Sequence, residues 1–100
     1  MLRKLLGSKT DYNELFKRGA VIIDVRSPQE FAGGAIPGSE NIPVGQIRGR
    51  LKDIKTWGVP VVCVCASGMR SGSAKVQLKA AGVEAYNGGP WTNMIPYVEE

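Results

Sequence analysis

The chain has 100 residues, of which 43% are hydrophobic and 22% charged, and this composition predicts a single globular domain, residues 1–100, with its own core. Histidine is absent, which excludes an imidazole base, a Cys–His catalytic pair and a histidine metal ligand. The two cysteines supply at most half of a tetrahedral zinc shell, so we expect no metal and no other cofactor.

The formal net charge of +4 favours anionic partners in general, but the 13 lysines and arginines are spread along the chain, and nucleic acid is not expected as a partner. Residues 1–9 are expected to be a flexible or peripheral N-terminus, because Arg3 and Lys4 interrupt their apolar stretch and leave no secretory signal. No run approaches the ~18 apolar residues of a membrane span. We therefore expect a cytoplasmic protein with free thiols and no membrane partner.

The first third of the chain predicts a helix, a strand and a second helix. Asp11 is placed to cap a short helix over residues 12–18. The run AVIID at 20–24 is apolar and β-branched and ends at a charged residue, as a fully buried parallel strand does. Ser27 then begins a brief helix, and Glu30 three residues later completes a capping box.

The middle of the chain predicts a loop and an amphipathic helix. Residues 36–43 hold two Ile-Pro pairs, which force extended backbone and indicate a short strand within a loop. Ile47, Leu51 and Ile54 then recur at helical spacing and form one apolar stripe. A basic stripe runs beside it, which we interpret as a solvated helix face rather than a binding surface; it consists of Arg48, Lys52 and Lys55.

The second half of the chain predicts a strand, a helix and another strand. PVVCVC at 60–65 is a buried strand, and residues 71–81 form a helix whose two apolar stripes predict cover on two sides. Residues 83–86 are expected to form the next strand. Residues 88–90 should then turn the chain into a last short helix interrupted by Pro96.

This alternation of apolar strands with helices defines the fold class. It predicts an α/β fold, an open parallel sheet of about four or five strands flanked by helices on both faces. In such sheets the reactive ligand lies beyond the carboxyl ends of the strands. Cys65 stands at one of these ends.

The segment VVCVCASGMRSGS at 61–73 carries the chemistry. It places a thiol, Cys65, at the end of a buried strand and before a small-residue loop, an arginine and a helix. Loop N–H groups and a helix N-terminus stabilise a thiolate, and Arg70 adds a full positive charge, so Cys65 is predicted to be a nucleophile. Cys63 lies inside the strand between valines and is predicted to belong to the core.

At this point the sequence resembles the single-domain rhodanese-like sulfurtransferases, the thiosulfate sulfurtransferase family, over roughly residues 10–97. The resemblance implies a rhodanese-like fold and the transfer of a sulfane sulfur through a persulfide on Cys65. The donor would be a small anion, thiosulfate or a related persulfide, and the acceptor cyanide, a thiol or a protein. Four segments carry the resemblance: IIDVRSPQEF at 22–31, GAIPGSENIP at 34–43, VVCVCASGMRS at 61–71 and NGGPW at 87–91.

The resemblance also implies roles for the residues around Cys65. The loop amides and the Arg70 side chain, as an anion contact, would bind the substrate. Ala35 stands where the family commonly has a histidine, which bears on loop packing or substrate preference more than on the reaction. The substrate-binding set is Ala66, Ser67, Gly68, Met69, Arg70 and Ser71.

Three further residues resemble structural positions of the family near the site. Asp24 ends a strand, and we expect it to make hydrogen bonds that fix a loop. Arg26 is expected to form an ion pair with Glu30.

Two other functions compete with sulfur transfer. Cysteine-dependent phosphatases and arsenate reductases resemble the motif, but they place one residue more between cysteine and arginine than the four here. The shorter loop makes a smaller ring of amides, which suits one sulfur atom and excludes a phosphoryl group. The second alternative is a persulfide carrier without turnover, or a rhodanese-like module that binds a protein.

Overall fold

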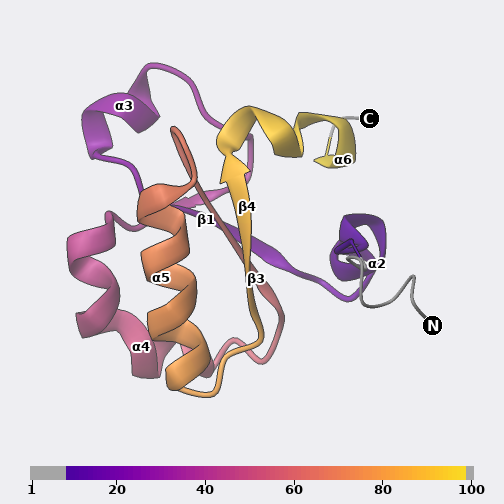
Figure 1. The fold of residues 1–100 in the computed structure, drawn as a ribbon, viewed down its shortest axis with the longest axis vertical. Coiled ribbons are helices and arrows are strands. Elements are labelled where there is room, and N and C mark those ends of the chain that lie inside the picture. Colours follow the sequence, from indigo (N-terminus) through magenta and orange to yellow (C-terminus); the bar gives the residue numbers. More distant parts are fainter. Residues whose placement is uncertain (1–8, 99–100) are drawn as a thin grey trace.

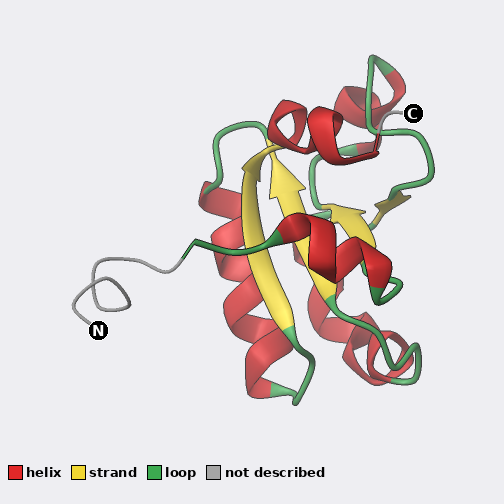
Figure 2. Ribbon diagram, turned by 90° about the vertical axis from the view of Figure 1, so that its right-hand side faces the viewer, coloured by secondary structure: helices red, strands yellow, loops and turns green. Residues whose placement is uncertain are grey.

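The computed structural model describes residues 9–98, so nearly all of the predicted N-terminal stretch lies outside the described residues. Four parallel strands form one sheet in the order β2-β1-β3-β4 (Figure 1), which confirms the predicted α/β fold. Figure 2 shows the sheet between its two helix layers. The elements are α2 (Tyr12–Lys17), β1 (Val21–Asp24), α3 (Pro28–Ala32), β2 (Glu40–Asn41), η1 (Val44–Gln46), α4 (Ile47–Lys55), β3 (Val61–Cys65), α5 (Met69–Ala80), β4 (Ala85–Pro90), η2 (Trp91–Met94) and α6 (Ile95–Val98).

Strand β3 lies between β1 and β4, and all five of its residues are buried. Alternate side chains of a strand point to opposite faces of the sheet, so VVCVC contributes to two cores. Cys63 and Cys65 pack with residues of α4 and α5 on one face. Val62 and Val64 pack with Leu15 of α2 and with other apolar side chains on the opposite face. The sequence pattern of a fully buried strand is thus confirmed.

The N-termini of the first two helices form as their sequences predict. The Asp11 side chain accepts a hydrogen bond from the Glu14 N–H, 3.1 Å away, at the start of α2. Ser27 and Glu30 form the predicted capping box at α3, each side chain accepting from the other residue's N–H. Both N-terminal caps depend only on residues close in sequence, so the sequence alone predicts them.

Helix α5 differs from its prediction. It begins at Met69, and only one of its faces is covered: Ala74 and Leu78 are buried, while Val76 is 65% exposed. The prediction that both apolar stripes are covered is wrong, because in this sheet α5 lies on the outer side of one face, between the strands and solvent (Figure 1). On α4, the basic stripe Arg48, Lys52 and Lys55 is exposed.

Strand β4 also differs from its prediction. It starts at Ala85 and continues through Pro90, so residues 88–90 are strand rather than the predicted turn. A register shift makes this possible: Cys63 faces Asn87, whereas the next residue of β3, Val64, faces Gly89. Gly88 is the additional residue of the bulge, and Gly89 has a φ of +78°, a conformation that glycine adopts without strain.

The two C-terminal helices, η2 and α6, follow each other without a loop, and α6 packs against α2. The sequence predicts that Pro96 interrupts the last helix, but Pro96 lies in the first turn of α6, where a missing N–H costs no hydrogen bond. The Tyr12 and Tyr97 rings pack with centroids 5.3 Å apart. Among the residues that the structure describes, no helix has the length and apolar character needed to span a membrane.

The tight packing around Gly88 gives a test of the fold. A Cβ at this position would lie 2.9 Å from Val62 Cγ1 and 3.0 Å from Val64 Cγ1, both in the core beneath β4. We expect Gly88→Ala to lower the free energy of unfolding by about 1–3 kcal/mol, measured by urea denaturation.

Gly49→Ala is the matched control. Gly49 lies inside α4, and a Cβ added there would have no neighbouring atom within 4 Å, so alanine should raise stability by about 0.5–1 kcal/mol. Equal effects of the two substitutions would contradict the packing described for β4.

Candidate active site

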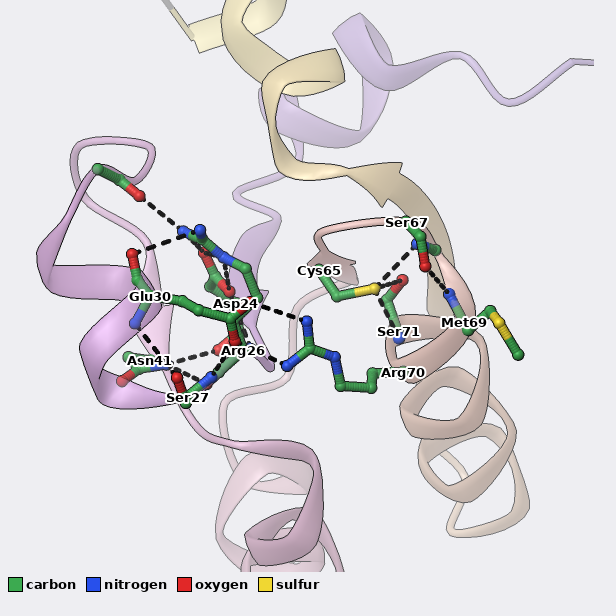
Figure 3. A network of polar contacts seen from close by, with 12 residues as sticks. Asp24, Arg26, Ser27, Glu30, Asn41, Cys65, Ser67, Met69, Arg70 and Ser71 are labelled. Atoms are coloured by element: carbon green, nitrogen blue, oxygen red, sulfur yellow. Dashed lines mark hydrogen bonds and ion pairs between the residues drawn. The ribbon is translucent and has the colours of Figure 1, made fainter.

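The site is built where β3 ends and α5 begins. Cys65 is the last residue of β3, and Gly68, with a φ of +103°, turns the chain into the N-terminus of α5. Glycine adopts this left-handed conformation without strain, and the Gly68 N–H points back to the strand end. Figure 3 shows the Cys65 sulfur enclosed by this turn and by the first residues of the helix.

The Cys65 sulfur accepts hydrogen bonds from the loop around it. The Gly68 N–H lies 2.9 Å from Sγ and the Ser71 N–H 3.4 Å from it, and the Ser71 hydroxyl oxygen is 3.3 Å away. Cys65 and Ser71 are both fully buried. Burial alone would raise the pKa of Cys65, but hydrogen bonds from Ser71 and Gly68 outweigh it and lower this pKa to about 7.

The other loop residues of the predicted set do not all contact the sulfur. The Met69 N–H points to the Ser67 hydroxyl oxygen, 3.4 Å away, and the Met69 side chain is 82% exposed. Ala66 and Ser67 are exposed on the outer side of the loop. The Ser67 backbone nevertheless contributes a hydrogen bond that lowers the pKa of Cys65, and the binding of substrate by residues 66–71 stays a prediction.

Cys63 lies two residues before Cys65 and is fully buried in the core cluster, as the sequence predicts. Burial raises the pKa of Cys63 to about 12, with a smaller contribution from the neighbouring Cys65. The two thiols of β3 therefore differ strongly in acidity, and only Cys65 forms a thiolate near neutral pH.

Arg70 lies at the edge of the loop and binds Glu30 of α3. Its two terminal nitrogens donate to the two carboxylate oxygens at 2.8 and 3.1 Å, and both side chains are 38% exposed. This hydrogen-bonded pair, together with the Ser27 N–H, lowers the pKa of Glu30 to about 2. The guanidinium that the sequence predicts as an anion contact is thus already held by a carboxylate of the protein.

The predicted ion pair between Arg26 and Glu30 is wrong, because Arg26 turns to Asp24 instead. The two side chains form a buried pair with nitrogen–oxygen distances of 2.7 and 2.9 Å. Arg26 also donates to the Gly34 carbonyl at 2.7 Å and stacks over Trp91, 4.8 Å from the ring centroid. These contacts tie together the loops after β1, and we propose that Asp24 and Arg26 serve the site through them rather than by touching substrate.

One residue near the site was not found by sequence reasoning. The Asn87 side chain, on the bulge of β4, contacts the Ser71 hydroxyl at 2.7 Å and the Gly68 carbonyl at 3.0 Å. Its position in NGGPW was part of the resemblance, but nothing in the sequence indicates which side chain it meets. In the structure Asn87 lies opposite Cys63, directly before the bulge of β4.

The space next to the loop is a surface groove of about 850 Å³. Residues of α2, the end of β4 and α6 line it together with Ser67, Gly68 and Met69, and none of the lining residues is charged. Cys65 is not among the lining residues, but Gly68, whose N–H donates to the Cys65 sulfur, is one of them. Residues 9–98 contain no group of three His, Cys, Asp or Glu side chains that could hold a metal ion.

Residues 8–90 match the family Rhodanese, described as the Rhodanese-like domain. The chain belongs to this family. Solved structures agree: it is similar to a rhodanese with anions from E. coli, with 28% identity and a TM-score of 0.67 over 74% of this chain and 89% of that chain. A rhodanese-related protein from Thermoplasma volcanium gives 30% identity and a TM-score of 0.68 over 89% of this chain and 85% of that one.

Curated relatives include proteins with and without an assigned activity. The uncharacterized protein YqhL of Bacillus subtilis is 43% identical over 79% of this chain and 65% of its own length. The thiosulfate sulfurtransferase GlpE of Pseudoalteromonas translucida is 36% identical over 70% of this chain and 66% of its own length. The chain thus spans about two thirds of these relatives, and some members of its family are named sulfurtransferases.

The contrast between the two thiols predicts a single acidic cysteine. In a Cys63→Ser protein, the rate of alkylation by iodoacetamide should rise with pH around a midpoint near 7, because only the thiolate reacts. A free thiol would show its midpoint at ~8.5.

In the matched Cys65→Ser protein, Cys63 should stay unreactive across the same pH series while the protein remains folded. A midpoint at the ordinary thiol value in the Cys63→Ser protein would contradict the role assigned to the loop.

Proposed function

We propose that this protein is a sulfurtransferase that moves a sulfane sulfur from thiosulfate or a related persulfide to a thiophilic acceptor through a persulfide on Cys65. The observation that carries the proposal is the cradle around the buried Cys65 sulfur. It consists of the Gly68 N–H, the Ser71 N–H and the Ser71 hydroxyl. Such a ring of donors stabilises a negative charge on sulfur without a metal or an imidazole. It supports the thiolate before transfer and a persulfide anion after it.

The reaction runs in two displacements. The Cys65 thiolate attacks the outer sulfur of thiosulfate, a sulfur–sulfur bond to Cys65 forms, and the donor's sulfur–sulfur bond breaks with its electron pair leaving as sulfite. The acceptor, cyanide or a thiolate, then attacks the outer sulfur of the persulfide. The electron pair of that bond returns to Cys65, which regenerates the thiolate, so the cycle needs no external oxidant or reductant.

The reaction requires Cys65 as a free thiol at the start of each cycle. We therefore infer that the protein works in a reducing compartment such as the cytoplasm. Cys63 and Cys65 are both unpaired, which is compatible with this setting. A small anion, rather than nucleic acid or a membrane, is the substrate that the cradle fits.

Arg70 is proposed to assist the binding of an anionic donor. Its guanidinium is partly exposed at the edge of the loop, and its bidentate contact with Glu30 already displays the geometry that a sulfonate or carboxylate requires. A donor anion can share Arg70 with Glu30 or displace it. Glu30 therefore acts as a competitor that weakens the attraction of Arg70 for charged donors.

The central test is the intact mass of the protein. Thiosulfate should add the mass of one sulfur atom, and cyanide should then remove it with formation of thiocyanate. Cys65→Ser should take up no sulfur, because a hydroxyl forms no persulfide, whereas the matched variant Cys63→Ser should load and unload normally.

Uptake without release to cyanide or to any small thiol would contradict a turnover enzyme and favour a carrier. Loading of Cys65→Ser but not of Cys63→Ser would show that the nucleophile is assigned to the wrong cysteine.

Arg70 and Glu30 give a paired test of donor binding. Arg70→Lys replaces the planar guanidinium, which can bind two oxygens at once, by a single ammonium group. KM for thiosulfate should therefore rise by about tenfold, with a smaller change for an uncharged sulfane donor. Glu30→Gln keeps an oxygen for the Ser27 cap but removes the competing charge, so KM for thiosulfate should fall. Steady-state rates on both donors measure this. Equal changes on the charged and the uncharged donor would mean that Arg70 shapes the loop and binds no substrate.

A further inference from the structure

The Asn87 carboxamide has an orientation that its backbone neighbours dictate. Its oxygen accepts from the Gly89 N–H at 2.9 Å, and its nitrogen donates to the Gly68 carbonyl at 3.0 Å. An N–H can only donate and a carbonyl can only accept, so the oxygen and nitrogen cannot be exchanged. The oxygen is therefore the atom that faces the Ser71 hydroxyl, 2.7 Å away.

This orientation determines where the Ser71 proton points. The Asn87 oxygen carries no hydrogen, so the short contact must use the hydroxyl proton of Ser71. The Ser71 oxygen then faces Cys65, at 3.3 Å, with its lone pairs only. In this arrangement the Cys65 thiol donates to Ser71, and Ser71 donates to Asn87.

A thiolate needs the opposite arrangement. Sulfur has then lost its proton and can only accept, so the Ser71 hydroxyl has to turn away from Asn87 to stabilise it. Donation of the Ser71 hydroxyl to the thiolate therefore costs its hydrogen bond to Asn87. The two acceptors, the sulfur and the Asn87 oxygen, compete for one proton.

We propose that Asn87 is a positioning residue that sets how readily Cys65 ionises, by competing with the sulfur for the hydroxyl proton of Ser71. By holding that proton, Asn87 favours the thiol and keeps the thiolate from becoming too stable. A thiolate that is less stabilised is a stronger nucleophile, and attack is fastest when a thiol ionises near the ambient pH. The same carboxamide also holds Gly68, whose N–H is the closest donor to the sulfur.

Several features of the fold aim Asn87 at the loop. The bulge at Gly88 changes the register of β4 directly after Asn87, and bulges next to active sites commonly redirect a side chain. The Tyr12 hydroxyl of α2 donates to the Asn87 carbonyl at 3.3 Å. A Cβ on Gly72 would lie 3.2 Å from the Asn87 nitrogen, so the glycine leaves room for the carboxamide.

A double-mutant cycle tests the inference, using the wild-type protein, Asn87→Ala, Ser71→Ala and the double variant. The readout is the pH midpoint of Cys65 alkylation, with Cys63→Ser as the common background. Other charged or titratable groups around the loop are the same in all four proteins and cancel from the cycle. They are Asp24 at the end of β1, Arg26 after it, Glu30 on α3, Arg70 on α5 and Tyr12 on α2.

Competition for the Ser71 proton predicts a coupling of definite sign. Asn87→Ala frees the Ser71 proton for the sulfur, so it should lower the alkylation midpoint when Ser71 is present. Relative to the effect of the same substitution in the Ser71→Ala background, this decrease should be about half a pH unit or more, the size of one neutral hydrogen bond. Equal changes in both backgrounds would overturn the proposal, because Asn87 would then act through the loop alone.

A second variant keeps the test valid if Asn87→Ala does not fold. Asn87→Asp retains an oxygen for Ser71 and adds a negative charge, so the midpoint should rise; a fall would overturn the proposal. Asn13→Ala, an exposed asparagine on α2, is the matched control and should leave the midpoint unchanged. The inference deepens the proposed function, but the test measures ionisation of Cys65, so a failure of sulfur transfer would be seen separately.

Discussion

The proposed reaction depends on one constraint, which is that a buried sulfur has to carry a negative charge without a cation in contact with it. Cys65 is fully buried, and burial disfavours the thiolate. Histidine is absent from the chain, and the guanidinium of Arg70 is turned to Glu30. What remains are oriented N–H groups and one hydroxyl. Their effect on the sulfur depends on distances of about 3 Å, so the loop must be held rigidly.

The rigidity comes from both sides of the loop. On one side the bulged end of β4 packs closely against it, and a Cβ on Gly68 would lie 3.4 Å from the Gly89 backbone. On the other side the buried pair of Asp24 and Arg26 fixes the chain after β1, and Arg26 stacks on Trp91, which follows β4. The two supports therefore meet at the carboxyl edge of the sheet. Three neighbouring strands, β1, β3 and β4, each contribute one part of the site.

Local signals in the sequence predicted local structure, and tertiary contacts decided the rest. The capping box at Ser27, the buried strand at 61–65 and the position of a thiol at its end follow from neighbouring residues, and the structure has them where expected. The ion pairs do not follow in this way, because Glu30 could meet either Arg26 or Arg70, and only the fold assigns it to Arg70. The bulge of β4 could not be predicted from the sequence for the same reason, since it depends on contacts with another strand. The register shift lies where β4 pairs with β3, and a side chain at Gly88 would collide with Val62 and Val64 of that other strand.

The two cysteines of β3 show what the loop contributes. They lie two residues apart on the same face of one strand, and both are fully buried, yet burial raises the pKa of Cys63 to about 12 while the pKa of Cys65 is lowered to about 7. Cys63 lies deeper, in the middle of the sheet, which accounts for part of the difference. The remainder comes from the donors of Gly68 and Ser71, since Cys63 has no comparable loop around it in the described structure. A cysteine in the middle of the strand thus stays a core residue, whereas one at the strand's end meets the turn at Gly68, and that turn supplies the donors that make its thiol acidic.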